Sequence, residues 1–414
     1  METIQGGQYL QGTIGGDKDY EILASILEGS NDSLRANGFL SVLCAGAGSD
    51  SMFAHISTAP VARDMLEIVD RIDEQKRKSC DKKSSDVSKL QYLGVSYGTL
   101  LGNTFASMFP GRVSRMLLDS LIDADDYIQD GTSITPVDAE TYSDKSAGGI
   151  RKKIDNLIQN LEQNPAVEVH NRRIQLVISH IAKDAIRQMM YQPIVQYGLA
   201  LKVLALAVAS SYSVLLDTAA GNANTVSQTD MCVQAGASLP LSEFSAANEA
   251  GIAVFYGDSC QNPELHNATW AENTAKHFSE QSVITEESWS HVALSCSGWK
   301  FNPKYPYRGP FGYLGPKKDE KNAPDALVLF LSNHYDHATP LFNAYRMSQQ
   351  HSGSTVAIQE AAGHCTLLTS TSKCIKDIGS RYFATDVVPA NKTICQPDCQ
   401  PGIPYKECPG FVAF

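Results

Sequence analysis

The sequence predicts an α/β fold built on a parallel sheet, and two observations carry this prediction. An apolar segment at residues 90–95 runs through a Gly-Val-Ser-Tyr-Gly turn into a helix of small and apolar residues, and a second apolar segment follows at residues 113–119. Strand, helix and strand at this spacing form a parallel βαβ unit. Two more apolar segments, residues 326–332 and 355–359, flank another predicted helix and extend the same pattern.

The turn at residues 94–98 must change strand into helix within one residue. Ser96 is therefore expected in a strained conformation, with its hydroxyl pointing out of the sheet. Gly94 and Gly98 flank it because a Cβ at either place would collide with the backbone of the turn. The following helix directs its N-terminal amides at Ser96, which suits a developing oxyanion. Gly-x-Ser-x-Gly alone is a weak motif, with an ordinary glycine turn as the alternative, and the flanking strand and helix favour a nucleophile.

Composition limits the range of partners. The chain has 414 residues, of which 43% are hydrophobic and 19% charged, enough for one large domain or two ordinary ones. Its formal net charge is −11, without a basic block. Nucleic acid and anionic membrane surfaces are therefore not expected as partners.

Cysteine usage favours a protein of the secretory route. The chain has 10 cysteines, and Cys395, Cys399 and Cys408 lack the fourth nearby ligand of a metal site. We expect disulfides, and neither a metal nor a cofactor. The first residues, however, show no basic region and no apolar core of a signal peptide. The prediction is then either a protein that stays inside the cell or a natural N-terminus upstream of Met1.

The residues before the turn read mostly as helix and loop. Residues 1–20 form a loose arm, and short helices are predicted at residues 19–27 and 34–44. Apolar residues recur at helical spacing after Thr58, which predicts a capped amphipathic helix to about residue 75. A loop rich in Lys and Ser, residues 76–88, then leads into the strand before Ser96.

Several short motifs resemble one known family. Four segments look like the corresponding segments of the tripeptidyl aminopeptidase-like α/β hydrolases. They are His-Ile-Ser-Thr-Ala-Pro-Val-Ala-Arg-Asp-Met-Leu at residues 55–66, the Gly-Val-Ser-Tyr-Gly-Thr turn, Phe-Pro-Gly-Arg-Val with Leu-Leu-Asp, and Asp-Ala-Asp-Asp-Tyr ending at residue 127. These are secreted exopeptidases and related hydrolases of fungi and actinobacteria. The resemblance implies an α/β-hydrolase fold and a short peptide with a free N-terminus as substrate.

The same resemblance divides the chain into three parts. Residues 1–127 would be the N-terminal part of the core, residues 128–245 a helical cap, and residues 246–414 the C-terminal part of the core with a Cys-rich tail. Within the cap, isoleucines and Val177 between residues 174 and 186 predict one amphipathic helix. Residues 194–216 form an apolar run that hydropathy alone could read as a membrane span. Lys202 and Gly198 interrupt it, so we predict a buried helix and no membrane span.

A serine hydroxyl becomes a strong nucleophile only when a base removes its proton, and a carboxylate must orient that base. In this fold the chain order is serine, acid, histidine, with the last two after successive late strands. Asp336 and His364 meet both demands, and they match the family's Asp before Thr-Pro-Leu and its Gly-His-Cys. The predicted catalytic triad is therefore Ser96, Asp336 and His364.

Other residues compete for these roles. Asp336 could be an ordinary turn aspartate, and His364 a surface histidine. Asp119 ends a strand and is the runner-up acid, with a structural role as its main alternative. His334 and His337 flank Asp336, but neither follows the last strand, where the histidine of this fold is expected. Both are therefore interpreted as loop residues.

The oxyanion hole departs from the family pattern. One donor is the backbone N–H of Tyr97, while the second normally comes from a His-Gly-Gly or Gly-Gly-Pro-Gly loop after an earlier strand. No such motif precedes Ser96, and Gly46-Ala-Gly48 is a weak substitute. The N-terminal half of the sheet is therefore predicted to be reduced or missing. Either catalysis is impaired in a shortened or truncated chain, or another amide or another subunit supplies the donor.

The leading function is a serine hydrolase that cleaves a short peptide, amide or ester through an acyl-enzyme. A tailoring hydrolase of fungal secondary metabolism uses the same chemistry and is the first alternative. A non-catalytic binding protein that lacks a complete oxyanion hole is the alternative of another class.

Two further expectations concern covalent and subunit structure. The resemblance implies a Cys260–Cys296 disulfide, and Cys365–Cys374 is considered as a second pair. The strand before Ser96 would expose an apolar parallel edge, which is an association hazard. Residues 1–50 are expected to fold over this edge, or a second chain to cover it, so self-association is possible there.

Overall fold

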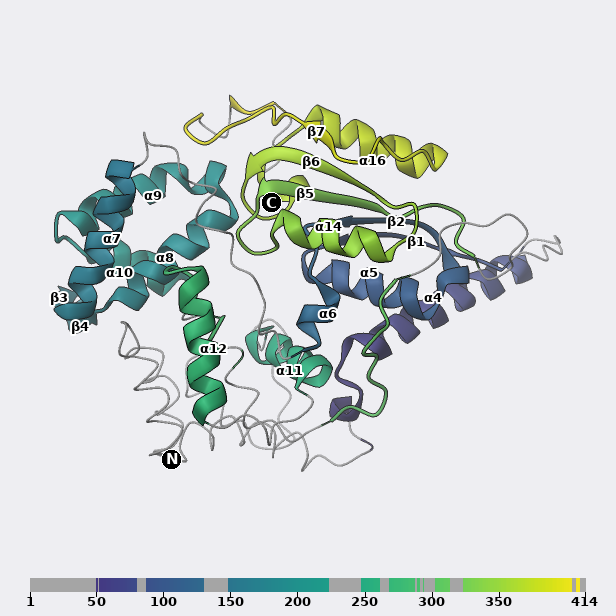
Figure 1. Ribbon diagram of the computed structural model, residues 1–414, viewed down its shortest axis with the longest axis horizontal. Helices are drawn as coiled ribbons and strands as arrows, with labels where there is room; N and C mark the ends of the chain where they lie inside the picture. The colour runs from purple at the N-terminus through teal and green to yellow at the C-terminus, as the bar shows by residue number, and fades with distance from the viewer. Residues whose placement is uncertain are drawn as a thin grey trace.

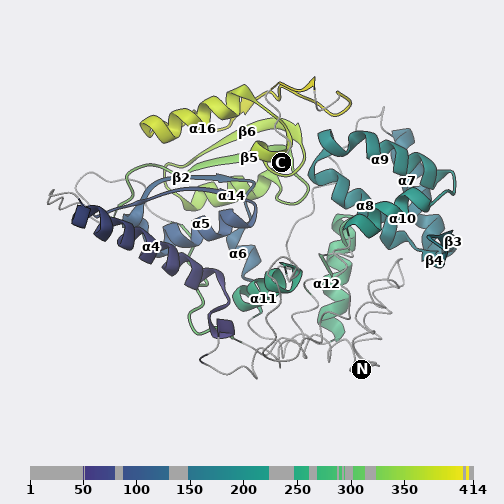
Figure 2. The same ribbon diagram turned by 180° about the vertical axis from the view of Figure 1, so that it is seen from behind.

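The computed structural model describes residues 50, 52–79, 87–129, 148–222, 247–260, 268–286, 289–290, 293, 302–312, 323–403 and 407–409. The helices predicted within residues 1–49 lie outside these ranges. A twisted sheet lies between layers of helices, and a second helical group sits beside the ends of its strands (Figure 1; Figure 2 from behind).

Five strands form the central sheet, all of them parallel, in the order β1-β2-β5-β6-β7. The strands are β1 (Leu90–Val95), β2 (Val113–Asp119), β5 (Leu329–Tyr335), β6 (Thr355–Ala362) and β7 (Thr393–Cys395). The predicted parallel α/β arrangement is confirmed, while the short strand β7 was not predicted. The motif at Ser96 follows β1, and the predicted acid and histidine follow β5 and β6.

Both faces of the sheet are buried at β2, β5 and β6, which explains why these strands read as continuous apolar runs. Leu118 and Phe330 point into a core with α4 (Thr58–Ser79), α5 (Tyr97–Met108) and α14 (Leu341–Gln350). Leu117 and Leu329 point to the opposite face, where α16 (Lys373–Thr385) packs. Figure 1 shows α16 alone on one side of the sheet and α4, α5 and α14 on the other.

Strand β1 forms an edge of the sheet within the described residues. It pairs only with β2, and the side chain of Leu93 is 48% exposed. No strand precedes β1 in the described part of the chain, and the prediction of a reduced N-terminal half stays a prediction. The segment predicted to cover this edge, residues 1–50, lies almost wholly outside the described ranges, so its role stays a prediction.

The region between β2 and β5 forms the separate helical group. It contains α7 (Gly148–Gln163), a hairpin of β3 (Ala166–His170) and β4 (Arg173–Val177), α8 (Ser179–Tyr191), α9 (Pro193–Val208) and α10 (Ser213–Asn222). The amphipathic helix predicted from Ile174 is wrong in its first turn. Asn171 and Arg172 both have positive φ angles and form the turn of the hairpin, which places Ile174 in β4, and the helix begins only at Ser179.

The apolar run at residues 194–216 forms two helices, α9 and α10, rather than the single buried helix that was predicted. The chain breaks between them at Ser210, whose φ is 59°. Leu199 and Leu201 of α9 are 40% and 50% exposed, so α9 buries only part of its surface. Within the described ranges, every helix is too short or too polar to serve as a membrane span.

Two helices lead the chain back towards the sheet, α11 (Ala247–Ser259) and α12 (Ala268–Gln281). Phe255 of α11 joins the core below the sheet. Lys183 of α8 links the helical group to the segment after α12. It is almost fully buried, and its ammonium lies 2.9 Å from Glu162 of α7 and 3.0 Å from Glu286 after α12. A buried ammonium between two carboxylates keeps its charge because both partners offset the loss of water.

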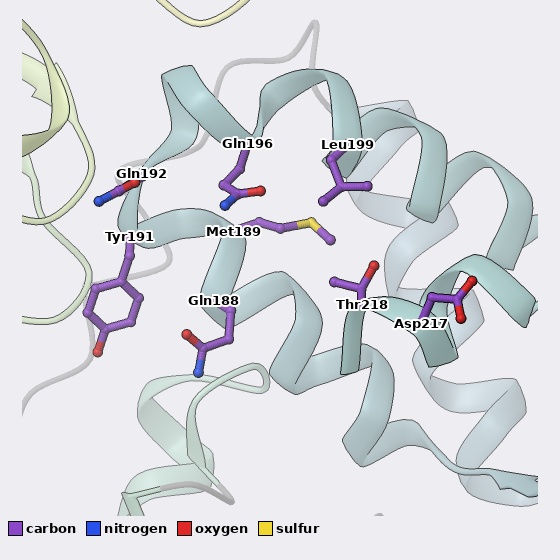
Figure 3. Close-up of a pocket in the computed structure, with 8 residues that line it drawn as sticks. All are labelled: Gln188, Met189, Tyr191, Gln192, Gln196, Leu199, Asp217 and Thr218. Atoms are coloured by element: carbon purple, nitrogen blue, oxygen red, sulfur yellow. The ribbon is translucent and has the colours of Figure 1, made fainter. Parts of the chain in front are cut away.

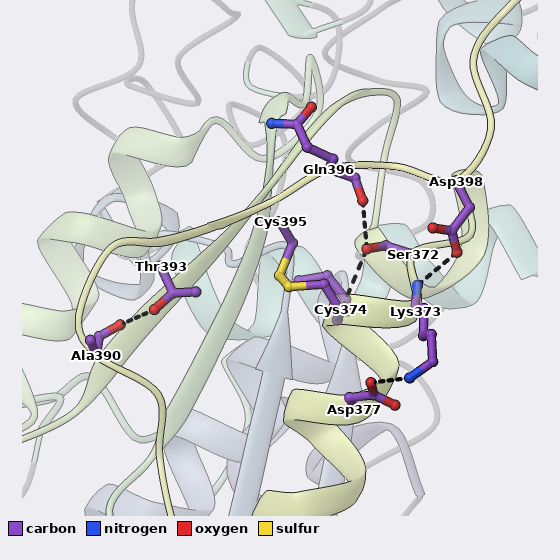
Figure 4. Close-up of a disulfide and its surroundings, with 10 residues drawn as sticks. Ser372, Lys373, Cys374, Asp377, Ala390, Thr393, Cys395, Gln396 and Asp398 are labelled. Atoms are coloured by element: carbon purple, nitrogen blue, oxygen red, sulfur yellow. Dashed lines mark hydrogen bonds and ion pairs between the residues drawn. A yellow bond between two sulfur atoms is a disulfide. The ribbon is translucent and has the colours of Figure 1, made fainter.

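The C-terminal segment is held by disulfides (Figure 4). Cys374 of α16 bonds to Cys395 of β7. Beside it, Ser372 caps α16 by accepting the N–H of Ile375, and its hydroxyl donates to the carbonyl of Gln396 at 2.8 Å. A second bond joins Cys399 and Cys408.

The predicted Cys365–Cys374 pair is wrong, because Cys374 is already bonded to Cys395 and Cys365 is a free, buried thiol. Its backbone N–H donates to the hydroxyl of Ser120 at 3.0 Å, which fixes Cys365 behind the predicted acid rather than beside α16. Cys260 is disulfide-bonded. Cys296 lies outside the described residues, so its pairing with Cys260 stays a prediction.

Candidate active site

The turn after β1 has the predicted strained geometry. Strand β1 ends at Val95 and α5 begins at Tyr97, which leaves Ser96 alone between them with φ 55° and ψ −123°. A Cβ on Gly94 would lie 2.4 Å from the carbonyl oxygen of Gly98, so the backbone excludes any larger residue there. The reason for Gly98 differs from the prediction, because a Cβ there would approach only the Tyr92 hydroxyl, at 3.3 Å.

Hydrogen bonds lock this turn to neighbouring segments. The hydroxyl of Tyr92 donates to the carbonyl of Gly98 at 2.8 Å. The N–H of Ser96 donates to the carbonyl of Asp119, at the end of β2, at 3.0 Å. Thr99 donates its hydroxyl proton to the carbonyl of Ser96 at 2.6 Å and accepts the N–H of Ile122 at 3.1 Å. The serine is therefore held rigidly over the ends of β1 and β2.

Asp336 and His364 come together although 28 positions separate them in the chain. Nδ1 of His364 lies 3.0 Å from each carboxylate oxygen of Asp336. Asp336 is fully buried, and its carboxylate also accepts the N–H groups of Ala338 and Thr339 at 2.9 Å and the Thr339 hydroxyl at 2.9 Å. Because Asp336 accepts from Nδ1–H, the proton-free nitrogen of His364 is Nε2.

The environment keeps Asp336 ionised. Burial acts to raise the pKa of this carboxyl, but the hydrogen bond and charge of His364 and the N–H of Thr339 outweigh it and lower the pKa below its ordinary value. A buried carboxylate that stays charged can orient an imidazole and stabilise the imidazolium that forms when the ring takes a proton. Pro340 occupies the N-cap position of α14, and Thr339 supports Asp336.

The loop that carries His364 is anchored from two sides. Asn333 on β5 donates its amide to the carbonyl of Gly363 at 2.8 Å. The N–H of His364 donates to the carbonyl of Tyr191 at the end of α8 at 3.0 Å, and the Tyr191 ring stands edge-on to the imidazole at 5.4 Å. Gly363 has φ 109°, and a Cβ there would lie 2.6 Å from Pro193. The helical group therefore helps to set the position of His364.

Ser96 and His364 line one pocket of about 130 Å³. No hydrogen bond joins their side chains in the described structure, and such contacts often tighten only when substrate binds. Around the two residues the pocket is walled by aromatic rings and polar groups. Its other lining residues are Ile122, Asp123, Asp126, Tyr127, Tyr191, Phe255, Trp289, Ala338, Thr339 and Asn343.

The competing candidates do not contact the imidazole of His364. Asp119 accepts the N–H groups of Thr366 and Leu367 at 3.0 Å each, at the start of α15 (Thr366–Thr369), and burial raises its pKa to about 6. Nδ1 of His334 bonds Glu360 at 2.9 Å. Burial lowers the pKa of His337 to about 4, and its ring stands edge-on to that of Tyr191.

The side chain of Tyr97 is held by a short hydrogen-bond chain that sequence reasoning missed. Its hydroxyl lies 2.7 Å from Oγ1 of Thr58, the first residue of α4. Thr58 donates its hydroxyl and its backbone N–H to Asp258 of α11 at 2.5 and 2.8 Å. Because the single hydroxyl proton of Thr58 goes to Asp258, Tyr97 is the donor to Thr58. Tyr97, whose N–H is the predicted oxyanion donor, is thus fixed through α4 and α11.

A second cavity of about 470 Å³ lies within the helical group (Figure 3). Its wall is rich in amides, from Gln188, Gln192 and Gln196, and Asp217 and Thr218 lie at its other end. Tyr191 lines this cavity as well as the pocket that holds Ser96. The larger cavity therefore borders the pocket on its histidine side.

Comparisons with known proteins agree with this geometry. Residues 281–395, which include Asp336 and His364, match a family model described as TAP-like protein. A tripeptidyl aminopeptidase of Streptomyces lividans and one of Streptomyces coelicolor are each 24% identical to this chain over 374 residues. The match covers 85% of this chain and 60% of each relative. A serine protease named Hip1 from Mycobacterium tuberculosis is 28% identical over 121 residues, which is 29% of this chain and 19% of that protein.

Proposed function

We propose that this chain, which is similar to the TAP-like family of α/β hydrolases, is a serine hydrolase acting through an acyl-enzyme. Ser96 is the nucleophile, His364 the base and Asp336 the residue that orients the base. One observation carries the proposal. His364 is hydrogen-bonded to the buried, ionised Asp336, and His364 lines the same pocket as Ser96, which lies at a strained strand-to-helix turn.

The proposed steps follow from this arrangement. Oγ of Ser96 attacks the substrate carbonyl carbon while Nε2 of His364 takes the hydroxyl proton, and Asp336 stabilises the imidazolium. The carbonyl oxygen becomes an oxyanion that the N–H of Tyr97 faces. His364 then gives the proton to the leaving amine or alcohol as the carbon–leaving-group bond breaks. Water, activated by the same imidazole, hydrolyses the resulting ester of Ser96 and restores the free serine.

We further propose that the substrate is a short peptide with a free N-terminus. Two acidic residues support this, because Asp123 and Asp126 are buried and line the pocket with Ser96. A carboxylate beside the scissile bond offers a partner for an α-ammonium group. Asp123 is also bound by Arg346 at 2.8 Å, and the proposal assigns the ammonium contact to the pair of carboxylates. The names of the Streptomyces relatives favour the same substrate class.

Labelling with a fluorophosphonate probe tests the hydrolase proposal. Wild-type protein should be labelled, and Ser96→Ala should lose the label. Ser348→Ala is a matched control, because Ser348 lies on α14 and donates to the carbonyl of Tyr345, outside the pocket. A folded wild-type protein that takes no label would favour the binding-protein alternative. Labelling that persists in Ser96→Ala would assign the nucleophile elsewhere.

The peptide proposal has its own test. Tripeptide p-nitroanilides with a free and with an acetylated N-terminus are compared for kcat/KM. The free form should be preferred, and Asp126→Asn should reduce that preference. Equal rates on the two forms in the wild-type protein would remove the exopeptidase assignment and leave the hydrolase assignment intact.

A further inference from the structure

The pocket around Ser96 holds few groups that could act as a second oxyanion donor. Its carboxylates, Asp123 and Asp126, are acceptors when ionised. The hydroxyl of Thr339 already donates to Asp336 at 2.9 Å, and one N–H of the Asn343 amide donates to the carbonyl of Leu121 at 3.2 Å. The remaining side-chain donors in the lining are the second N–H of Asn343, the phenols of two tyrosines and one indole.

The two tyrosines differ in their surroundings. The ring of Tyr191 packs edge-on against His364, at 5.4 Å between ring centroids. Tyr127 packs instead against Phe255 of α11, and the charge of Asp258 and the neighbouring Tyr97 act on its ionisation. Tyr191 is therefore committed to the base, which leaves Tyr127 as the candidate phenol in the pocket with Ser96.

Tyr127 is held in place before any substrate arrives. It ends α6 (Ala124–Tyr127), whose N-cap Asp123 accepts the N–H of Asp126 and is itself bound by Arg346. The Tyr127 ring stands edge-on to Phe255 at 5.0 Å and 82°. Donors that need not reorganise during the reaction stabilise a transition state best.

Tyr127 lines the pocket and is 7% exposed, and no hydrogen bond of its hydroxyl to another described residue is found. A phenol that reaches the pocket without a protein partner is open to a hydrogen bond with a ligand oxygen. Burial, with the charge of Asp258 and the neighbouring Tyr97, raises the pKa of Tyr127 well above its ordinary value. The phenol therefore keeps its proton and remains a donor at neutral pH.

We propose that the hydroxyl of Tyr127 is a second oxyanion donor, acting with the N–H of Tyr97. This inference rests on the proposed hydrolase function. In this chain the second oxyanion donor then comes from the segment after β2, whereas in the family pattern it comes from a loop after an earlier strand. When the carbonyl carbon becomes tetrahedral, its oxygen accepts the phenolic proton as a hydrogen bond, and no proton is transferred.

The test uses Tyr127→Phe, which removes the hydroxyl and keeps the ring against Phe255. With p-nitrophenyl butyrate as substrate, kcat should fall roughly 10²–10³-fold, the usual cost of losing one oxyanion donor, while KM changes little. Affinity for phenylboronic acid, whose adduct on Ser96 resembles the tetrahedral intermediate, should fall in parallel. A purely structural role would lower the melting temperature instead and leave both the kcat and the boronate affinity of the folded protein unaltered.

Controls keep this result distinct from a failure of the hydrolase proposal. Tyr345→Phe, which removes a hydroxyl outside the pocket, should keep wild-type kcat. If the wild-type protein takes no fluorophosphonate label, the hydrolase proposal itself fails. If it is labelled and Tyr127→Phe retains wild-type kcat, or if Trp289→Phe alone shows the loss, the assignment of Tyr127 is wrong.

A structure of the wild-type protein with phenylboronic acid decides the question even where Tyr127→Phe does not fold. The phenolic oxygen should lie roughly 2.5–3.0 Å from a boronate oxygen, the range of an O–H···O hydrogen bond. A separation of more than about 3.5 Å would overturn the assignment.

Discussion

Replacing Asp258 with asparagine should flatten the pH dependence of stability between pH 4 and pH 7. Burial raises the pKa of Asp258 from 3.8 to about 6, against the opposing hydrogen bonds from Thr58. The folded protein thus holds this proton more tightly than the unfolded chain does. The corresponding stability is fully present below about pH 4 and is lost as pH rises through about 6.

The size of the effect follows from the shift. About two pKa units at 1.36 kcal/mol per unit correspond to about 3 kcal/mol of unfolding free energy. Asp258→Asn keeps an oxygen that can accept the Thr58 N–H but has no proton to gain or lose. The unfolding free energy of wild type minus that of the variant should therefore fall by about 2 kcal/mol from pH 4 to pH 7, because the unfolded carboxyl is already partly ionised at pH 4.

Denaturant unfolding of both proteins at a series of pH values measures this difference. The comparison isolates Asp258 because Asp119, the other buried carboxyl with a pKa near 6, is present in both proteins. Asp155→Asn, which removes an exposed carboxylate of α7, is the matched control and should reproduce the wild-type curve. A difference that stays constant within about 0.5 kcal/mol across this range would refute the reasoning, because linkage requires a slope wherever the two pKa values differ.

Three further predictions concern the triad, the thiols and the sheet edge. Ser96→Ala, Asp336→Asn and His364→Ala should each lower turnover by ~10⁴ or more with native circular dichroism, because the three act as a unit; full activity in Asp336→Asn would promote Asp119 to the acid. Non-reducing peptide mapping should recover Cys365 as a free thiol, and finding it in a disulfide would contradict the structure. Amides of β1 should exchange with solvent as slowly as those of β5; exchange at the rate of a frayed terminus would show an uncovered edge, and protection with concentration-dependent mass would indicate a second chain.

The parts of the site that the sequence predicted are those set by local geometry and strand order. Ser96 lies in a turn whose glycines and flanking elements are contiguous in sequence, and Asp336 and His364 each follow a strand that reads clearly as apolar. Long-range contacts were missed, such as the bond of Thr58 to Asp258, which lie 200 positions apart. No local pattern marks such partners, because each residue reads as a plain helix residue in its own segment.

The errors in the helical group have a related cause. Hydropathy could not separate α9 from α10, because the break at Ser210 depends on a single positive φ angle within an apolar run. The hairpin of β3 and β4 carries apolar residues that also fit a helical period, and only its turn distinguishes the two. Periodicity therefore failed where backbone conformation decided the element, and Ile174, read as part of a buried helix face, is 79% exposed.

Strands β2 and β5 are neighbours in the sheet, paired from Leu117 with Leu329 to Asp119 with Leu331. The long segment between them leaves the sheet and re-enters it at the adjacent position, so none of the strand pairing depends on what it contains. Evolution could lengthen, shorten or exchange this segment without moving the frame that holds Ser96. Yet the same segment contributes Tyr191, against His364, and Asp258, which fixes Tyr97 through Thr58. Substitutions in this segment that change substrate selectivity should therefore change the reaction rate as well.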